Sequence, residues 1–290
     1  MDYEIVMDVA GDIDAKVASA NNIRFIPMEF TVGDAARICS GPEPQEVLTQ
    51  FYNGQREGDL TKTSQISPYQ YEEFLKEIFE EGKSVLYLCL SGGLSSTYHS
   101  ACVARELLLE KYPGCAFYPI DTLSATGGMG ILAERAVKNR EKGMSAEENL
   151  NDLNAAKEKL DHWFMVDDLA YLKRGGRISA STAIVGTALN VKPILTINGE
   201  GKLETVAKKR GNNAALNELC SRFSERFDSA TEEPVYILHA DAKDKADQLY
   251  EHVKERLAGR EVRICGLSPI IGAHTGPGMA ALCFMGSGRE

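Results

Sequence analysis

The segment from Lys62 to Tyr98 contains two hydroxyl-rich turns separated by one helix and one buried strand. The first turn, Thr63–Ser67, ends in a plausible N-cap serine, and Pro68 suits the first helical position. Val85–Leu90 is a continuous apolar run, as expected of a strand covered on both faces. Because ligands bind at the carboxyl ends of parallel strands, the second turn, Ser91–Tyr98, can meet the first around one small anionic group. This segment therefore predicts a site built from hydroxyls and backbone amides.

The same alternation of strands and helices continues to about residue 160. Ala116–Ile120 has the length and composition of a strand, and Gly130–Lys142 is mostly helical in pattern. Ser145 and Glu148 form a candidate capping box for a helix reaching about Leu160. Repeated βαβ units predict a mostly parallel sheet.

The pattern changes after residue 161. Asn198-Gly199-Glu200-Gly201 is a strong hairpin signal between the strand-like runs Pro193–Asn198 and Lys202–Ala207. Further helices and strands are predicted at Asn213–Phe227, Val235–His239, Ala242–Leu257 and Val262–Gly266. The predicted fold is thus α/β with two domains, an amino-terminal α/β domain at 1–160 and a carboxy-terminal α+β domain at 161–290.

Charge and cysteine usage exclude several classes of function. The net charge of −10 disfavours a surface that neutralises nucleic-acid phosphates. The seven cysteines are scattered without a C-x-x-C pair, which indicates reduced core residues rather than a disulfide framework or zinc site. No apolar run approaches the ~20 residues that span a bilayer, so we expect a cytoplasmic protein with no integral membrane segment.

Three further motifs are candidates for chemistry. Leu172–Ser179, with its glycines and arginines, suits a carboxylate or phosphate, although a glycine-terminated helix with solvated basic residues explains it equally well. His274–Gly278 places an imidazole beside a hydroxyl in a tight turn. Asp8 follows the first strand, Tyr3–Met7, and is a weak candidate alone. Gly127–Gly130 does not have dinucleotide-loop spacing and is interpreted as helix packing.

A serine hydrolase is the main alternative. Ser91, Ser95 and Ser96 lie at a strand-to-helix turn, but the strained G-x-S-x-G elbow is absent and His99 is the only nearby histidine. A triad using His274 needs an acid such as Asp8 or Asp121. An anion cradle explains the hydroxyls more simply, yet the esterase hypothesis for the Ser91–Ser96 loop stays open.

Taken together, the motifs resemble the DegV family of bacterial fatty-acid-binding proteins. The resemblance runs in order over nearly the whole chain. It rests on Thr63-Ser64-Gln65 with Pro68, Leu90–Tyr98, Ile120-Asp121-Thr122 with Gly127–Gly130, Leu172–Ser179, and His274–Gly278.

The resemblance implies a two-domain lipid carrier rather than an enzyme. One long-chain fatty acid lies in a tunnel with its carboxylate near the domain interface. A separate ATP-dependent fatty acid kinase then converts this carboxylate to an acyl phosphate for phospholipid synthesis. The carrier has no cofactor of its own and no metal, and ATP and Mg are expected on the kinase. Its amino-terminal domain is also similar to one in dihydroxyacetone kinases.

The same resemblance assigns the site residues. Thr63 and Ser95 are expected to bind the carboxylate directly, with Ser64 and Ser96 as neighbours and His274 approaching from the second domain. Supporting or kinase-facing roles are expected for Thr275, Gly276, Arg177 and Arg174.

The chain departs from the family pattern in its first loop. Asp8 is retained, but Val9–Asp14 lacks the usual Ser/Thr-rich turn, which puts the role of that loop in doubt. Ile66 stands where proline is commoner, and Gly92-Gly93 adds small residues to the serine loop. The carboxylate site itself is unaffected by these changes.

Overall fold

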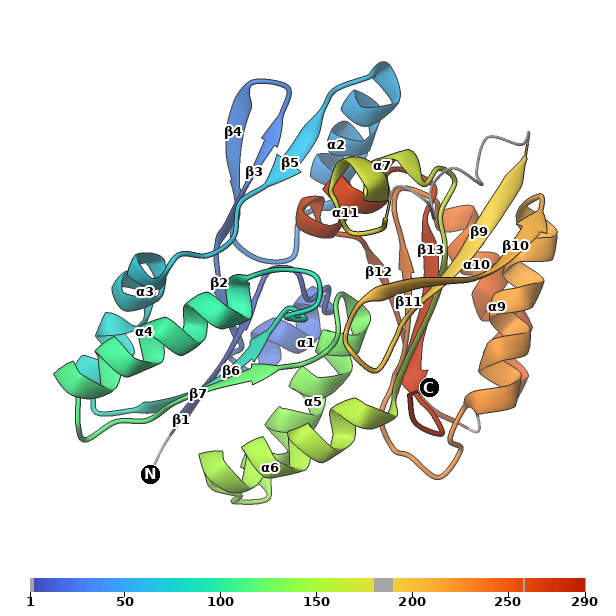
Figure 1. Cartoon of the computed structure of the whole chain (residues 1–290). Helices are drawn as coiled ribbons and strands as arrows, with labels where there is room; N and C mark the ends of the chain where they lie inside the picture. Colours follow the sequence, from blue (N-terminus) through green and yellow to red (C-terminus); the bar gives the residue numbers. More distant parts are fainter. Residues whose placement is uncertain (1–2, 180–189, 258, 290) are drawn as a thin grey trace.

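The computed structural model describes residues 3–179, 190–257 and 259–289, whose backbone forms three β-sheets (Figure 1). Two large sheets lie side by side, and a small third sheet stands above the junction between them in the view of Figure 1. The predicted α/β architecture is confirmed, while the domain boundary near residue 160 stays a prediction.

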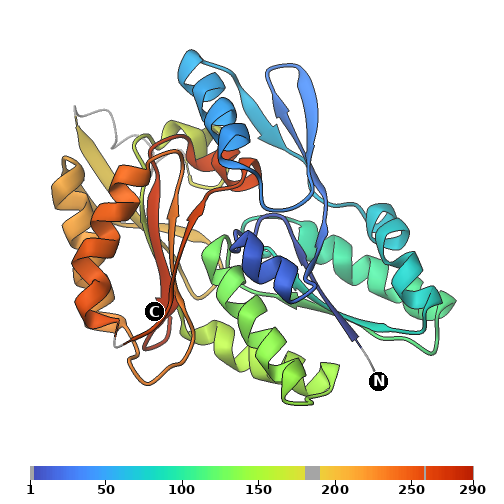
Figure 2. The same ribbon diagram turned by 180° about the vertical axis from the view of Figure 1, so that it is seen from behind.

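The first sheet is wholly parallel, with strand order β2-β1-β6-β7. Helices α3 and α4 pack together on one face and α5 and α6 on the other (Figures 1 and 2). The strands are β1 (Tyr3–Asp8), β2 (Arg24–Ile26), β6 (Ser84–Cys89) and β7 (Phe117–Asp121), and the helices are α1 (Ala15–Ala20), α3 (Pro68–Glu80), α4 (Thr97–Lys111), α5 (Gly127–Glu141) and α6 (Ala146–Ala156).

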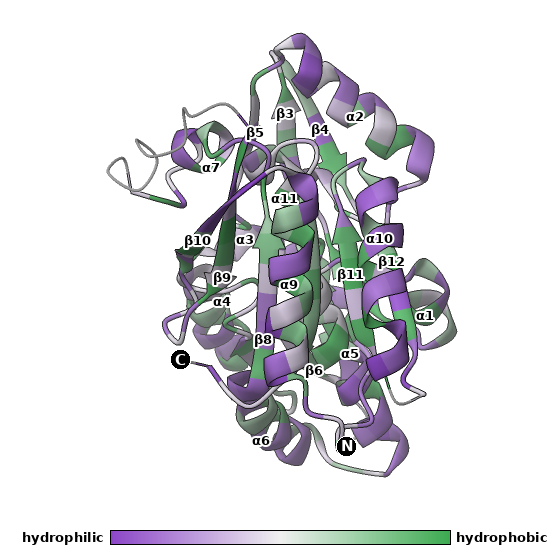
Figure 3. Ribbon diagram, turned by 90° about the vertical axis from the view of Figure 1, so that its right-hand side faces the viewer, coloured by the Kyte–Doolittle hydropathy of each residue, from purple (hydrophilic) through white to green (hydrophobic). Residues whose placement is uncertain are grey.

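The second sheet is mixed, with strand order β10-β9-β8-β13-β11-β12, and only the β11–β12 pair is parallel. Helices α9 and α10 cover its outer face, with polar residues toward solvent and apolar residues toward the strands (Figure 3). The elements are β8 (Leu160–Met165), β9 (Val191–Ile197), β10 (Leu203–Arg210), α9 (Asn212–Arg226), β11 (Val235–His239), α10 (Lys243–Val253), β12 (Val262–Gly266) and β13 (Ala280–Met285), with 3-10 turns at Lys157–Lys159 and Lys254–Arg256.

The third sheet, with order β4-β3-β5, was not predicted. It comprises β3 (Met28–Val32), β4 (Ala35–Cys39) and β5 (Thr61–Thr63), beside α2 (Gln45–Glu57), and it packs on α11 (Pro269–Thr275), which also contacts α7 (Ala170–Arg174). Gln55 Nε2 donates to the carbonyl of Gly272 at 3.0 Å, and Thr61 Oγ1 donates to that of Ala273 at 3.1 Å. Residues from the first half of the chain therefore hold a helix from the far end of it.

Local signals located most elements well. Ser67 is the N-cap of α3 with Pro68 in the first turn, as predicted, and Gln70 completes a capping box that was not predicted. Helix α6 instead ends at Ala156, because a 3-10 turn leads directly into β8. Helix α5 begins at Gly127, and a Cβ there would lie 2.5 Å from Tyr236 Cβ, which confirms that these glycines serve packing.

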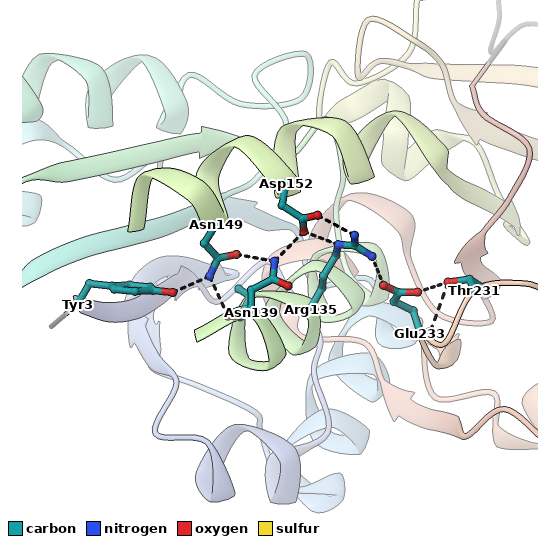
Figure 4. Close-up of polar contacts among 8 residues, drawn as sticks. Tyr3, Arg135, Asn139, Asn149, Asp152, Thr231 and Glu233 are labelled. Atoms are coloured by element: carbon teal, nitrogen blue, oxygen red, sulfur yellow. Dashed lines mark hydrogen bonds and ion pairs between the residues drawn. The ribbon is translucent and has the colours of Figure 1, made fainter. Parts of the chain in front are cut away.

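A polar network ties α5 and α6 to both halves of the chain (Figure 4). Arg135 on α5 donates to both carboxylate oxygens of Asp152 on α6, at 2.6 and 2.8 Å, and also pairs with Glu233 before β11. Asn149 on α6 donates to the hydroxyl of Tyr3 at 2.9 Å. The helix pair thereby links the first strand of one sheet to the other sheet. Within the described ranges, no helix is long and apolar enough to cross a membrane.

Candidate functional site

A cavity of about 460 Å³ is lined by strands of the second and third sheets and by the turns that follow β6 and β7 of the first sheet. It meets solvent beside Ser64, Gln65, Gly92 and Ser96, which are exposed. Its deeper lining is buried or half-buried and mainly apolar, and it comprises Leu90, Ala125, Thr126, His162, Phe164, Ile197, Leu203, Met279, Ala281 and Cys283. The volume lies within the roughly 300–1,000 Å³ typical of small-molecule sites.

At the mouth, the two hydroxyl-rich turns and the carboxy-terminal histidine come together. Thr63, the last residue of β5, has its Oγ1 atom 2.8 Å from Nε2 of His274, which lies near the end of α11. Ser64 follows Thr63 and is held to the third sheet by its backbone amide, which donates to the carbonyl of Glu29 at 3.0 Å. Ser95 and Ser96 line the same cavity from the turn before α4.

The turn after β6 is ordered by its own hydroxyls. Ser95 Oγ accepts from the backbone amide of Thr97 at 3.2 Å and lies 2.8 Å from Thr97 Oγ1. Ser91 Oγ donates to the carbonyl of Gly201 at 2.7 Å, in the hairpin turn between β9 and β10. Ser96 is the N-cap residue of α4 but makes no side-chain capping bond in the described structure. Ser91 thus serves to fasten the hairpin, whereas Ser95 faces the cavity.

His274 is a neutral imidazole at ordinary pH. Burial, with a smaller contribution from the charge of Arg177, lowers the pKa of His274 to about 4. Its Nδ1 atom is buried and has no hydrogen-bond partner among the described residues. A Cβ on Gly175 would lie 2.3 Å from that atom, so the backbone of the Leu172–Ser179 segment approaches the ring as only glycine permits. His274 can therefore interact with a ligand by hydrogen bonding but not as a cation.

The neighbours of His274 have different placements. Thr275 lines the cavity, but its Oγ1 donates back to the carbonyl of Ile271 at 3.3 Å. Gly276 does not line it; its φ is 71°, and a Cβ would lie 2.4 Å from the ring of Tyr171. It shapes the turn after α11, which requires a glycine.

The two arginines of the Leu172–Ser179 segment also differ in their position relative to the cavity. Arg177 lines the cavity, donates from Nε to the carbonyl of Leu94 at 3.1 Å and also contacts the carbonyl of Gly175. Burial lowers the pKa of its guanidinium, and no acidic side chain in the described ranges forms an ion pair with it. Arg174 instead lies over the ring of Tyr171, 5.3 Å from its centroid, outside the cavity.

The far end of the cavity contains a pair that the sequence did not suggest. His162 on β8 pairs in register with Cys283 on β13, which lies four residues beyond Met279, or about 13 Å along the chain at the usual strand rise. His162 Nε2 lies 2.6 Å from Ser124 Oγ, and burial lowers the pKa of His162 well below its ordinary value. Thr126, at φ 53°, adds a hydroxyl from a strained backbone position. The sequence around His162 is an apolar strand with a single histidine, and such a pattern gives no local signal for a contact with a distant serine.

Asp8 lies outside the cavity lining and stabilises the start of the serine turn, Ser91–Tyr98. Its carboxylate accepts from the backbone amides of Leu90 at 2.8 Å and Ala10 at 3.0 Å, and from the Tyr87 hydroxyl at 3.2 Å. Burial is the main cause that raises the pKa of Asp8 to about 6. Its place is structural: it joins β1 to the residue that begins the turn.

Comparison with known proteins settles the family. A family model described as "Uncharacterised protein, DegV family COG1307" matches residues 2–287. The chain belongs to the DegV family. It is 34% identical over 288 residues to the DegV domain-containing protein CPE0026 of Clostridium perfringens, with 99% of each chain covered.

Solved structures of DegV proteins superpose on nearly the whole chain. A fatty-acid-binding DegV protein from Thermus thermophilus gives a TM-score of 0.85 at 29% identity, covering 98% of this chain and 100% of that one. The fatty acid kinase (Fak) B3 protein of Streptococcus pneumoniae, loaded with linoleic acid, gives a TM-score of 0.84 at 21% identity, covering 98% and 99%. At that lower identity the second similarity establishes the fold alone.

Proposed function

We propose that this DegV protein binds a long-chain fatty acid in the cavity and holds its carboxylate at Thr63, Ser95 and His274 for a separate ATP-dependent fatty acid kinase. The observation that carries the proposal is the polarity of the cavity, which has uncharged hydrogen-bonding groups at an open mouth and mainly apolar walls behind them. The fatty-acid binding of the Thermus thermophilus relative supports the same ligand class.

The apolar walls account for affinity. Burial of one methylene contributes about 0.8 kcal/mol, so a long acyl chain supplies a large gross gain, reduced by the cost of association and ordering. Leu90, Phe164, Ile197 and Met279 offer such contacts along the cavity. The mouth then has only to orient the carboxylate.

The mouth suits a carboxylate that must react further. Thr63 and Ser95 donate neutral hydrogen bonds, and the low pKa of His274 keeps that ring uncharged. Arg177 is the basic side chain among the described residues of the cavity lining, and it donates to the carbonyl groups of Leu94 and Gly175. An anion held mainly by neutral donors keeps more of its nucleophilicity toward the γ-phosphorus of ATP than one in a tight ion pair. In this proposal the kinase contributes ATP and Mg, and this chain contributes the positioned substrate.

Denaturing extraction of the purified protein followed by mass spectrometry tests the ligand. We expect close to one fatty acid per chain, and loss of retention in Thr63→Ala and Ser95→Ala. Incubation with the kinase of the same cell and Mg-ATP should then give acyl phosphate, which hydroxylamine traps as a hydroxamate. A lipid-free protein that also fails to take up added fatty acid would overturn the proposal.

The esterase alternative makes the opposite prediction. It requires hydrolysis of acyl esters without any kinase and loss of that activity in one serine variant. The Ser91 hydroxyl donates to a carbonyl rather than to a base, and His274 pairs with Thr63 rather than with a serine of the turn. Turnover of p-nitrophenyl esters that disappears in Ser91→Ala, Ser95→Ala or Ser96→Ala would favour the esterase.

A further inference from the structure

The loop after β1 is joined to the start of α11 by a buried hydrogen bond. Asp12 Oδ1 accepts from the backbone amide of Ser268 at 2.8 Å, across 256 positions of sequence. Ser268 is the N-cap residue of α11, and its own side chain makes no capping bond among the described residues. The bonded amide belongs to the N-cap residue itself, so Asp12 takes from another segment the part that an N3 side chain plays in a capping box, and its charge is favourable near a helix start.

Helix α11 forms part of the wall of the cavity and also carries part of its mouth. Ile270, Ile271 and His274 all line the cavity from this one helix. The helix has seven residues, so it is about 10 Å long at 1.5 Å per residue. Its middle is held by the bonds from Gln55 and Thr61, and its start by Asp12. Asp12 is therefore connected through one short helix to His274, which lies against Thr63.

The carboxyl group of Asp12 is poorly stabilised as an anion. Asp12 is 7% exposed, and neither its Oδ2 atom nor the Ser268 hydroxyl has a hydrogen-bond partner within the described ranges. Burial raises the pKa of Asp12 to about 7 and outweighs the opposite effect of the Ser268 amide and side chain. Both residues line a small cavity of about 160 Å³.

The charged and titratable groups around Asp12 are acids, thiols and one phenol, and no basic side chain pairs with it in the part of the chain that the structure describes. They come from its own loop, from the segment before α2, from α2, and from β4, β12 and β13. They are Asp14, Glu43, Tyr52, Cys39, Cys265 and Cys283.

We propose that Asp12 is a positioning residue for the carboxylate site. Asp12 acts through α11 on His274, so the rate of ligand release depends on whether Asp12 is protonated. Ionised Asp12 accepts the Ser268 amide in a charge-assisted bond, which is stronger than a neutral one. When the carboxyl group takes a proton from solvent, that bond weakens, and the new O–H can donate to the Ser268 hydroxyl oxygen instead. The statement about ligand rests on the proposed function, whereas the statement about His274 does not.

Ligand release is the first test. Dissociation of a fluorescent fatty acid is followed by stopped flow between pH 6 and pH 8, a range in which His274 stays neutral. We expect release from the wild-type protein to be about two- to fivefold faster at pH 6 than at pH 8, the size of one charge at a helix terminus. Asp12→Asn, which keeps the shape and an acceptor oxygen, should release at the faster rate throughout. A pH dependence in Asp12→Asn equal to that of the wild type would overturn the proposal.

Asp14→Asn is the matched control. Asp14 lines the same small cavity, but its Oδ1 accepts from the backbone amide of Lys16 at 2.8 Å and caps α1 rather than α11. This variant should keep the pH dependence of the wild-type protein, because it leaves the bond to α11 in place. Loss of the pH dependence in Asp14→Asn would point to the general charge of the cavity and not to Asp12.

The second test needs no ligand. The ring signals of His274, assigned by their loss in His274→Gln, are followed by NMR from pH 5.5 to 8.5 in the lipid-free protein. We expect an inflection near pH 7, well above the titration of His274 itself, and its disappearance in Asp12→Asn. Flat signals in the wild type, or an inflection that persists in Asp12→Asn, would refute the coupling. If the protein binds no fatty acid, the proposed function fails while this experiment still decides the role of Asp12.

Discussion

The cavity has one histidine–hydroxyl pair at its mouth and a second pair at its far end, where His162 lines the cavity and its partner Ser124 lies behind the lining. Thr63 and His274 are 2.8 Å apart at the mouth, and Ser124 and His162 are 2.6 Å apart at the far end. Both imidazoles have a buried Nδ1 without a partner among the described residues, and burial lowers the pKa of both. The chemistry of the two pairs is therefore nearly the same.

Their surroundings differ. Thr63 and His274 are half-buried and lie at the end of β5 and near the end of α11, beside the exposed Ser64 and Ser96. Ser124 is fully buried, and His162, at 3% exposed, lies within a strand of the second sheet. A hydroxyl at the mouth can donate to an incoming ligand, whereas the inner pair is fixed by packing. The same two side-chain types thus face an open mouth in one place and a packed interior in the other.

The largest effect is expected from a substitution that disrupts the inner pair, Ser124 and His162. In Gly128→Ala the new Cβ would lie 2.0 Å from His162 Nε2 and 2.3 Å from Ser124 Oγ. We expect a loss of about 3 kcal/mol in the free energy of unfolding, the upper range for overpacking a core, measured by urea denaturation. Gly114→Ala, where nothing lies within 4 Å of the new Cβ, is the control and should change little. Equal stability of the two variants would show that the inner pair is not rigidly packed.

The next effect concerns the mouth alone. Thr63→Ala removes a neutral donor to the proposed carboxylate, and hydrogen bonds to charged groups contribute about 1.5–3 kcal/mol. We expect fatty-acid affinity to fall roughly ten- to hundredfold, by titration calorimetry, with little change in unfolding of the lipid-free protein. Thr63→Ser should retain most of the affinity. If instead stability falls and affinity does not, the mouth pair resembles the inner one in being structural.

Acidification should affect both pairs in the same direction. Because the folded-state pKa of each histidine is below the unfolded value of about 6.5, the unfolded state binds more protons, and stability is lost as pH falls below that value. For His274 the loss is complete near pH 4. Between pH 7 and pH 5, the free energy of unfolding, measured by urea denaturation, should fall by roughly 1–2 kcal/mol less in His274→Gln than in the wild type. Asp12 has a raised pKa, so its contribution to the free energy of unfolding grows as pH falls, and it is the same in both proteins and cancels in the comparison. Parallel pH profiles of the wild type and His274→Gln would contradict the buried, neutral state of His274.

The smallest effect is expected at Arg174. Its guanidinium stacks on Tyr171 outside the cavity, a contact that contributes about 0.5–1 kcal/mol at an exposed site. Arg174→Ala should leave fatty-acid affinity within about twofold, while Arg177→Ala, at the mouth, should lower it. A large affinity loss in Arg174→Ala would show that residues outside the cavity lining also contribute to ligand binding.

Most secondary structure could be predicted because its signals are local. The strands at Val235–His239 and Val262–Gly266 were located without error, and the N-cap of α3 and the capping box of α6 were read from short patterns. The third sheet escaped prediction because its strands are short and, in β4, mostly exposed, so no apolar run marks them. Its contribution matters, since β5 ends at Thr63.

The mouth could be anticipated and the far end could not. Hydroxyl-rich turns after strands are visible in sequence, and Thr63, Ser64, Ser95, Ser96, Arg177, His274 and Thr275 do line one cavity, while their binding roles stay predictions. Gly276 and Arg174 lie outside it. His162 and Ser124 meet across 38 positions between a strand and a turn, and neither belongs to a motif.

By itself the sequence determined the parallel first sheet and the hydroxyl-rich turns at its edge, because helix caps, apolar runs and turn residues act over a few positions. The tertiary structure alone decided which residues meet. Thr63 and His274 are 211 positions apart, and Asp12 and Ser268 are 256 apart. Such contacts arise from the packing of α11 against the third sheet and the first loop, and packing depends on the shapes of surfaces that no local pattern specifies.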